Sequence, residues 1–337
     1  MAPGFDGVRA ALGRTVRLVE GEGAAVAAFV HGRPVVDLWA GAVPERGLVH
    51  TFSAVKPFAA TCVLLLVERG HVRLDDPVVR WWPELGAAGK GGIMVAHLLA
   101  HQAGLATVPG PVAGLLDHEA AAAALAAARP DWEPGRAHGE HALTYGNLLG
   151  ELVRRVDGRS LGRFLADELA GPLALDVHVG VPAAELGRVV DIVGATPAWW
   201  TERRGEPGSL RWNALGAGVD GELINSTAWR TGEVPAVNGH ATARALAAFY
   251  VAVLDGRVPA TVAQAATSGP DLVLGTDVTW TFGSLQLDDV ELGMGGAGGN
   301  YAGARPALGL AWAFLTTRMG GIDRAEDVER ALLAGAL

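Results

Sequence analysis

The sequence predicts an α/β (α+β) fold in which both ends of the chain build one antiparallel sheet and a helical lobe is inserted between them. Segments with the apolar pattern of strands lie near the N-terminus and again after residue 271, and the residues between them are rich in alanine, leucine and arginine. Such an arrangement covers a sheet with helices. We expect a single domain at residues 1–337, with a sheet lobe at about 1–52 and 271–337 and a mainly helical lobe at about 53–270.

The first segments predict a helix, a β-hairpin and a second helix. Residues 5–18 have the pattern of a helix, and residues 23–41 form two apolar runs on either side of a His-Gly-Arg-Pro turn at residues 31–34. The next helix is predicted at residues 53–70. Pro57 fits a helix only near its start, and the glycine at residue 70 is typical of a helix end.

The rest of the chain predicts the helical lobe and then the second half of the sheet. Residues 74–254 are predicted to be mainly helical, including a helix at 142–156, with long loops around 109–111 and 197–207. Strands are predicted at residues 272–274, 278–287, 290–293 and 307–317, followed by a helix at residues 325–334.

Composition excludes several classes of function. Half of the 337 residues are hydrophobic and 19% are charged, which is typical of a folded globular protein. The net charge of −9 disfavours a nucleic-acid partner, because such a partner requires a basic face. Cys62 is the only cysteine in the sequence and cannot form an internal disulfide.

Localisation is predicted from what the sequence lacks. The first residues do not have the pattern of a secretory signal, and no apolar run reaches the length of a membrane span. We therefore expect a cytoplasmic protein that acts on a small molecule and has no nucleic-acid or membrane partner. The sequence does not predict the oligomeric state.

Ser53 and Lys56 form a Ser-x-x-Lys motif at the predicted start of a helix. Residues three apart share a helix face, so the lysine amine can reach the serine hydroxyl. A serine is a weak nucleophile until a base accepts its proton, and a buried lysine with a lowered pKa can be that base, whereas arginine stays charged. Among its 27 basic residues the chain has only two lysines, Lys56 and Lys90, which strengthens this interpretation.

Several short blocks accompany this motif. They are Leu-Asp-Asp-Pro at 74–77, Trp-Pro-Glu at 82–84, His-Leu-Leu-Ala-His-Gln-Ala-Gly-Leu at 97–105, Trp-Glu-Pro-Gly at 132–135, Asn-Gly-His-Ala-Thr-Ala at 238–243 and Gly-Gly-Ala-Gly-Gly at 295–299. With them the chain resembles the serine β-lactamase-related family of class C β-lactamases, penicillin-binding proteins, and esterases and acyltransferases of an actinobacterial branch. The resemblance covers nearly the whole chain. It implies a β-lactamase/transpeptidase-like fold with the active site in the groove between two lobes.

The resemblance also implies an oxyanion hole and shows one departure beside it. The backbone N–H groups of Ser53 and Ala297 would form the hole, next to Gly295 and Gly296. Where the family carries Lys or His, this chain has Met294, whose thioether neither donates a proton nor carries charge. Met294 is expected either to shape an apolar pocket or to pack within its strand.

A second departure concerns the family's catalytic tyrosine, which lies five residues after the Pro-Gly pair. Glu140 occupies that position here. It could relay protons as an acid or base, pair with Lys56 and hold it charged, or point to solvent. Tyr145, in a Tyr-Gly-Asn sequence, is the other candidate for the tyrosine, but it falls within a predicted helix, where aromatic residues usually pack.

Other residues are candidates for the pocket. Trp199 and Trp200 would wall an acyl pocket or simply pack. His138 and His141 would assist proton transfer or be ordinary loop histidines.

Two patterns that suggest a ligand are discounted. Gly293-x-Gly295-x-x-Gly298 has the letters of a dinucleotide motif, but strand-like residues follow it instead of a helix. His97 and His101 are spaced like metal ligands but lack an accompanying glutamate. We expect neither a cofactor nor a metal.

The sequence thus predicts a serine hydrolase or acyltransferase that acts on a small ester, thioester or amide through a Ser53 acyl-enzyme, with secondary metabolism as a candidate setting. Two alternatives stay open. One is a non-hydrolytic cyclase, lyase or isomerase with altered proton-transfer residues, and the other is a catalytically silent binding protein.

Overall fold

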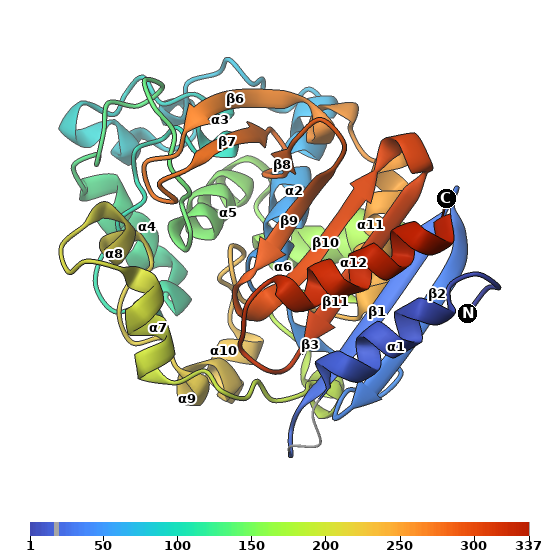
Figure 1. Cartoon of the computed structure of the whole chain (residues 1–337). Helices are drawn as coiled ribbons and strands as arrows, with labels where there is room; N and C mark the ends of the chain where they lie inside the picture. The colour runs from blue at the N-terminus through green and yellow to red at the C-terminus, as the bar shows by residue number, and fades with distance from the viewer. Residues whose placement is uncertain (17–19, 337) are drawn as a thin grey trace.

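An eight-stranded antiparallel sheet joins the two ends of the chain (Figure 1). The computed structural model describes residues 1–16 and 20–336. The strand order is β2-β1-β11-β10-β9-β8-β7-β6. The strands are β1 (Gly23–Val30), β2 (Arg33–Gly41), β6 (Ala265–Pro270), β7 (Asp277–Thr281), β8 (Gln286–Leu287), β9 (Leu292–Gly296), β10 (Asn300–Arg305) and β11 (Leu310–Thr316). Because β1 pairs with β11 along its length, the predicted sheet from both termini is confirmed.

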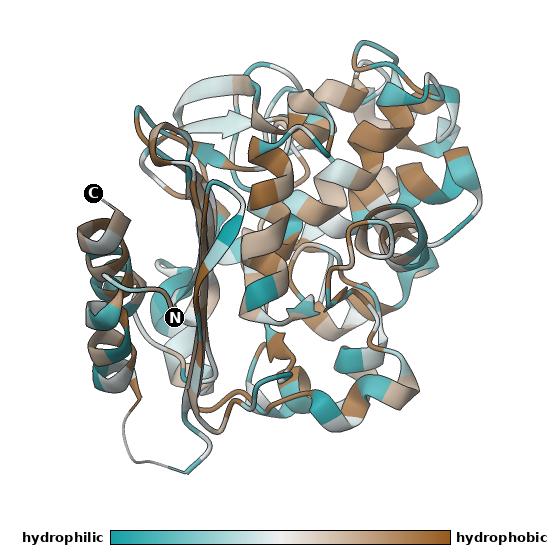
Figure 2. Cartoon of the chain, turned by 90° about the vertical axis from the view of Figure 1, so that its right-hand side faces the viewer, coloured by the Kyte–Doolittle hydropathy of each residue, from teal (hydrophilic) through white to brown (hydrophobic). Residues whose placement is uncertain are grey.

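Helices cover both faces of the sheet. Figure 2 views the sheet along its edge, with α1 (Asp6–Thr15) and α12 (Asp323–Ala336) on one side and the helical lobe on the other. α11 (Ala243–Leu254) packs against β1 and β11 from the lobe side. All seven residues of β11 are buried because the strand is covered on both faces.

The helical lobe surrounds one buried helix, α2 (Lys56–Glu68), which a 3₁₀ turn at Phe52–Val55 precedes. The other helices are α3 (Val95–Leu99), α4 (His118–Ala127), α5 (Thr144–Asp157), α6 (Leu161–Leu165), α7 (Pro197–Arg204), α8 (Leu210–Ala214), α9 (Gly221–Asn225) and α10 (Thr227–Thr231). A second small sheet pairs β3 (Val49–His50) and β4 (Val177–His178) with β5 (His240–Ala241). Within residues 1–16 and 20–336, every helix is too short or too polar to cross a membrane.

Several predicted boundaries are corrected. Residues 272–274 form a turn, because Asp271 accepts the backbone N–H groups of residues 273 and 274, and the strand of this region is β6. The predicted strand at 278–287 is interrupted after β7 by a turn at Ser284, whose φ is 55°. The sequence analysis did not predict β10.

Two helix predictions also change. Residues 197–204 form α7 instead of a loop, because the Thr196 side chain caps the backbone N–H of Trp199 and Pro197 fits the first turn. The N-terminal helix ends at Thr15, and residues 17 and 18 of its predicted extent lie outside the described residues.

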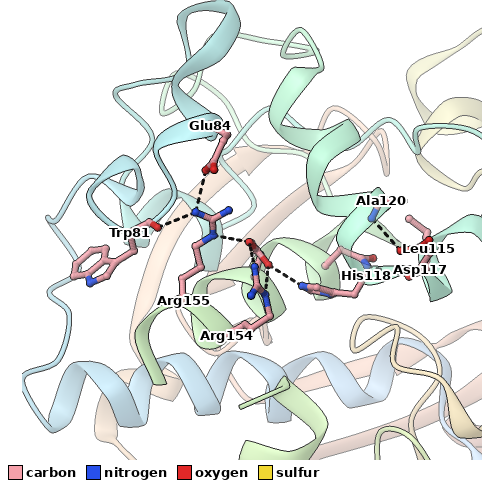
Figure 3. A network of polar contacts seen from close by, with 10 residues as sticks. Trp81, Glu84, Leu115, Asp117, His118, Ala120, Arg154 and Arg155 are labelled. Carbon is pink, nitrogen blue, oxygen red and sulfur yellow. Dashed lines mark hydrogen bonds and ion pairs between the residues drawn. The ribbon is translucent and has the colours of Figure 1, made fainter. Parts of the chain in front are cut away.

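Glu151, on α5, is a buried carboxylate held by three basic side chains. Figure 3 labels these three side chains, His118, Arg154 and Arg155. Arg154 donates to both of its oxygens at 2.8 Å, and Arg155 donates to Oε1 at 2.5 Å. His118 Nε2 lies 3.0 Å from Oε2. Arg155 also forms an ion pair with Glu84 at 2.9 Å. The contacts of His118 and Glu84 fasten α5 to α4 and to the 3₁₀ segment at Pro83–Gly89.

We predict that Glu151→Ala lowers the free energy of unfolding by roughly 2–3 kcal/mol, because it leaves clustered cations without a counter-charge. Burial raises the pKa of Glu151, but the hydrogen bonds from His118, Arg154 and Arg155 outweigh it, and the net pKa is well below the usual value. The stabilisation is therefore present above the pKa of an unfolded glutamate and is lost as the pH falls towards the folded pKa.

Urea denaturation of both proteins as a function of pH measures this difference. Glu133→Ala is the matched control, since Glu133 pairs with Arg136 on the surface, and its effect should stay within about 0.5 kcal/mol. Equal stability of E151A and the parent protein at neutral pH would contradict the assignment.

Candidate active site

Ser53 lies in the 3₁₀ turn that leads into α2. The residue before it, Phe52, has a φ of 49°, in the left-handed region that non-glycine residues rarely adopt. Such conformations gather at functional sites, where the surrounding structure holds them in place. Here Gly239 packs directly against the turn, because a Cβ at residue 239 would lie 2.5 Å from Val55 Cγ2 and 2.7 Å from Thr51 Oγ1. Close packing therefore holds the turn that carries Ser53.

Lys56 contacts Ser53 across one helical turn, as the Ser-x-x-Lys spacing predicts. Its Nζ lies 2.7 Å from Ser53 Oγ, and it donates to the carbonyl oxygens of Ala142 at 2.9 Å and Ala236 at 3.2 Å. The two carbonyls can only accept hydrogen bonds. If the amine is neutral, they occupy its two hydrogens and its lone pair is left for the Ser53 proton. The geometry suits a general base.

Burial adjusts the pKa of this amine. Lys56 is fully buried, and loss of hydration lowers its pKa, while the nearby Glu140 carboxylate partly offsets this by raising it. The net pKa of Lys56 lies below that of an ordinary lysine.

Glu140 faces the amine. Its Oε1 lies 3.2 Å from Lys56 Nζ, and only 12% of its side chain is exposed. The alternative in which Glu140 simply points to solvent therefore does not fit. Its two other roles, proton relay and counter-ion of Lys56, both fit this geometry.

Asp271 holds the loop that carries Glu140. Its Oδ1 accepts the backbone N–H groups of Glu140 at 3.1 Å, Val273 at 2.9 Å and Leu274 at 2.8 Å. Its Oδ2 accepts the indole N–H of Trp280 at 2.9 Å. Asp271 is 1% exposed, so these donors take the place of water around its charge. The sequence analysis did not predict this role. The donors Glu140 and Trp280 are 140 positions apart, and no short motif connects them with Asp271.

Tyr145, the other candidate for the catalytic tyrosine, packs in the hydrophobic core and is not among the residues that line the cavity described below. It is fully buried, its hydroxyl donates to the Leu99 carbonyl at 3.1 Å, and its ring stacks on His101 at 4.5 Å. Burial raises its pKa, and Ser284 is a further hydrogen-bonding neighbour. The packing interpretation of Tyr145 fits this position.

Ser53 and Glu140 open onto a cavity of about 250 Å³ between the two lobes. Its wall is mainly apolar and combines residues from both lobes: His50, Phe52, Ser53, Val112, Glu140, Ala142, Leu143, Trp200, Leu215, Val219, Ile224, Trp229, Val237, Leu274, Gln286, Met294, Gly295 and Ala297.

The end of β9 forms the sheet side of this cavity. Met294, Gly295 and Ala297 line it, and Met294 is only 3% exposed. Gly296 instead faces the nucleophile segment, because a Cβ there would lie 2.4 Å from the carbonyl oxygen of Thr51. The sheet edge and the turn that carries Ser53 thus approach each other closely beside the cavity.

The two loop histidines support the site without lining it. His138 Nδ1 lies 3.0 Å from Thr267 Oγ1, so the prediction of His138 as a pocket residue is corrected. His141 Nε2 accepts the Leu105 N–H at 3.0 Å, which leaves Nδ1 to donate to the Gly139 carbonyl at 2.9 Å. Burial lowers the pKa of His141 to about 4, so this side chain is a neutral brace of the Glu140 loop.

The two predicted tryptophans separate. Trp200 lines the cavity, and its ring lies 6.0 Å from that of Phe52. Trp199 packs edge-on against Trp200 at 4.7 Å, with the Arg203 guanidinium 3.5 Å above its ring, which corrects its assignment to the pocket wall. Trp229 lines the cavity but was missed by the sequence analysis; it donates to His50 Nε2 at 2.9 Å. These residues are 179 positions apart, and no local motif connects them.

Comparison with known proteins identifies the family of the chain. The profile of the Beta-lactamase family matches residues 14–336. The chain belongs to the beta-lactamase family. It is similar to the esterase/beta-lactamase LipL of Mycobacterium tuberculosis, with 36% identity over 260 residues, which cover 69% of this chain and 59% of LipL. The chain therefore spans less than two thirds of the length of that relative.

Two solved structures match over nearly their whole length. A family VIII carboxylesterase has a TM-score of 0.82 and 30% identity, over 99% of this chain and 98% of that one. EstA from Arthrobacter nitroguajacolicus has a TM-score of 0.86 and 28% identity, over 100% of this chain and 99% of that one. The predicted family and β-lactamase-like fold are confirmed.

We predict that Glu140→Gln lowers the apparent pKa of Lys56, because it removes the negative charge that raises it. Since the neutral amine is the base, the rate of Ser53 acylation should reach its plateau at lower pH in this variant. Stopped-flow acylation across a pH series measures the shift. Glu133→Gln makes the same charge change at an exposed residue and should leave the midpoint in place. An unmoved midpoint in E140Q would exclude Glu140 as the counter-ion.

We predict that Asp271 is a positioning residue for Glu140. Asp271→Asn replaces an acceptor of the Trp280 N–H with a second donor, and should lower the free energy of unfolding by about 2 kcal/mol. The acylation midpoint should move in the same direction as in E140Q, a change that a purely structural role would not cause. Thr267→Val is the control. It removes the hydrogen bond between Thr267 and His138, two residues before Glu140, and should not move the midpoint of the acylation rate.

Proposed function

We propose that the protein is a serine hydrolase that cleaves a small ester, thioester or amide through an acyl-enzyme on Ser53. The observation that carries this proposal is the 2.7 Å contact between Ser53 Oγ and a fully buried Lys56 amine, at the wall of a mainly apolar cavity. The similarity to esterases over nearly the whole chain supports the same chemistry.

In the first step the Ser53 oxygen attacks the substrate carbonyl carbon, and its proton passes to the neutral amine of Lys56. The carbonyl oxygen becomes an oxyanion. The bond from carbon to the leaving oxygen, sulfur or nitrogen then breaks, and the leaving group takes the proton back from Lys56. This step yields the alcohol, thiol or amine and an ester of Ser53.

In the second step water attacks the acyl-enzyme carbonyl and gives a proton to Lys56. The bond to Ser53 Oγ breaks, the serine oxygen takes that proton, and the carboxylic acid leaves. An alcohol or amine in place of water would make the same site an acyltransferase. We assign to Glu140 the sharing of the transferred proton in both steps, and its 3.2 Å distance from Lys56 supports this assignment.

The oxyanion is assigned to the backbone N–H groups of Ser53 and Ala297. Both residues line the cavity, and the close approach of Gly296 to Thr51 brings the end of β9 beside the nucleophile turn. Backbone donors that are fixed before the reaction need no reorganisation when the charge develops. This assignment does not depend on the side chain of residue 294.

A fluorophosphonate probe tests the proposal. Its phosphorus should bond to Ser53 Oγ with loss of fluoride, giving stoichiometric labelling in intact-mass spectra and loss of esterase activity. Ser53→Ala should take no label, whereas Ser268→Ala removes a surface hydroxyl and should label normally. Lys56→Met should slow acylation by about 10²–10⁴-fold, the usual contribution of a general base.

The alternatives predict other outcomes. Turnover of a substrate without any labelling of Ser53 would favour a cyclase, lyase or isomerase on this fold. Ligand binding with neither labelling nor turnover would favour a silent binding protein. Either result would overturn the acyl-enzyme proposal.

A further inference from the structure

The cavity beside Ser53 offers a substrate no free positive charge. Among the lining residues that the structure describes, Glu140 is the single side chain with a formal charge, and the other polar ones are His50, Ser53 and Gln286. Apolar side chains make up the rest of the wall. Small-molecule sites of this kind rely on a few polar groups for orientation, so the sign of the one charge matters.

His50 does not supply a cation. It is 1% exposed, and burial, together with nearby His240 and Arg230, lowers its pKa well below the usual value. Trp229 donates its indole N–H to His50 Nε2, which requires an unprotonated nitrogen there. The imidazole is therefore neutral and acts as an acceptor.

Lys56 does not supply a free cation either. Its amine is shared among Ser53 Oγ, the carbonyls of Ala142 and Ala236, and Glu140. These acceptors outnumber its hydrogens, so no N–H remains for a distant group of the substrate. Met294 also lines the cavity, and its thioether carries no charge.

From this charge distribution we infer that the site selects substrates with an uncharged apolar acyl group and rejects those whose acyl group carries a carboxylate. The inference rests on the proposed function and names its substrate class. A carboxylate in the cavity would lose its hydration without finding a counter-ion, and would face the Glu140 charge. Acyl chains that end in a carboxylate, such as monoesters of dicarboxylic acids, fall in the rejected class.

The orientation follows from the positions of the reacting groups. The leaving oxygen must lie near Lys56 to receive a proton, and the acyl chain occupies the rest of the same cavity. Phe52, Trp200 and Trp229 give this cavity an aromatic surface. The volume of about 250 Å³ lies below the roughly 300–1,000 Å³ of typical ligand pockets, so the acyl group is small.

A matched pair of esters tests the inference. 4-Nitrophenyl pentanoate and mono-4-nitrophenyl glutarate have acyl chains of equal length, which end in a methyl group and a carboxylate respectively. At neutral pH the ratio of kcat/KM, pentanoate over glutarate, should be at least about 100-fold after correction for spontaneous hydrolysis. A ratio near one, or a preference for the glutarate, would overturn the inference.

Two substitutions at residue 294 isolate the charge. Met294→Lys adds an ammonium group to the cavity wall and should lower the pentanoate/glutarate ratio by about tenfold or more. Met294→Gln adds polarity without charge and should keep the ratio of the parent protein. Circular dichroism checks that both variants fold. If M294K does not fold, the pentanoate/glutarate ratio of the parent protein still tests the inference.

The outcome also separates this inference from the proposed function. Hydrolysis of both esters at equal efficiency, with a Ser53 acyl-enzyme in mass spectra, would contradict the proposed charge selection but agree with the proposed serine hydrolase. Failure to hydrolyse either ester, together with no acylation of Ser53, would sink the proposed function itself.

Discussion

The rest of the site depends on the hydrogen bonds of the buried Lys56 amine. The amine connects three separate parts of the chain: the nucleophile turn, the residues before α5 and the segment before β5, through Ser53, Ala142 and Ala236. A lysine without water needs all of its hydrogens bonded, because an unsatisfied buried polar group is costly. The same burial that demands these contacts lowers the pKa of the amine. Structure and reactivity at Lys56 therefore have one physical cause.

The fold supplies this environment by bringing the two lobes together. The sheet contributes the end of β9, while the helical lobe contributes α2 and the loop before α5. Glycines permit the closest contacts: Gly239 packs against Val55, and Gly296 packs against the Thr51 carbonyl. Farther along α5, the contact of Glu151 with His118 and the ion pair of Arg155 with Glu84 fasten the helix whose beginning lies beside Lys56. Rigid elements thus hold the groups of the site from several directions.

The two departures from the family pattern act together. Glu140 places a carboxylate near the amine, at the position where the resemblance implies a tyrosine, and Met294 places a thioether where the resemblance implies a basic side chain. Both changes remove positive charge or donor capacity from the cavity and leave the Ser53–Lys56 pair intact. The consequence we infer is a change in the charge of the accepted substrate, with the covalent chemistry retained.

The sequence by itself determined the elements whose causes are local. The Ser-x-x-Lys spacing places both groups on one helical face, and the turn at residues 31–34 makes a hairpin. Strand-like segments near both ends of the chain, with a helical region between them, predict the antiparallel sheet. The sequence also singled out Glu140 as the unusual residue. These features depend on residues a few positions apart, and short-range patterns record them well.

Only the tertiary structure decided the contacts between distant segments. It placed Tyr145 in the core and Glu140 at the amine, and it joined His50 to Trp229. It also showed Asp271 as the acceptor that holds the Glu140 loop, and a turn where the sequence pattern indicated a strand. In each case a side chain contacts a partner that is far away in the sequence. Burial and hydrogen bonding in the folded core make that choice, and neither is encoded in the spacing of neighbouring residues.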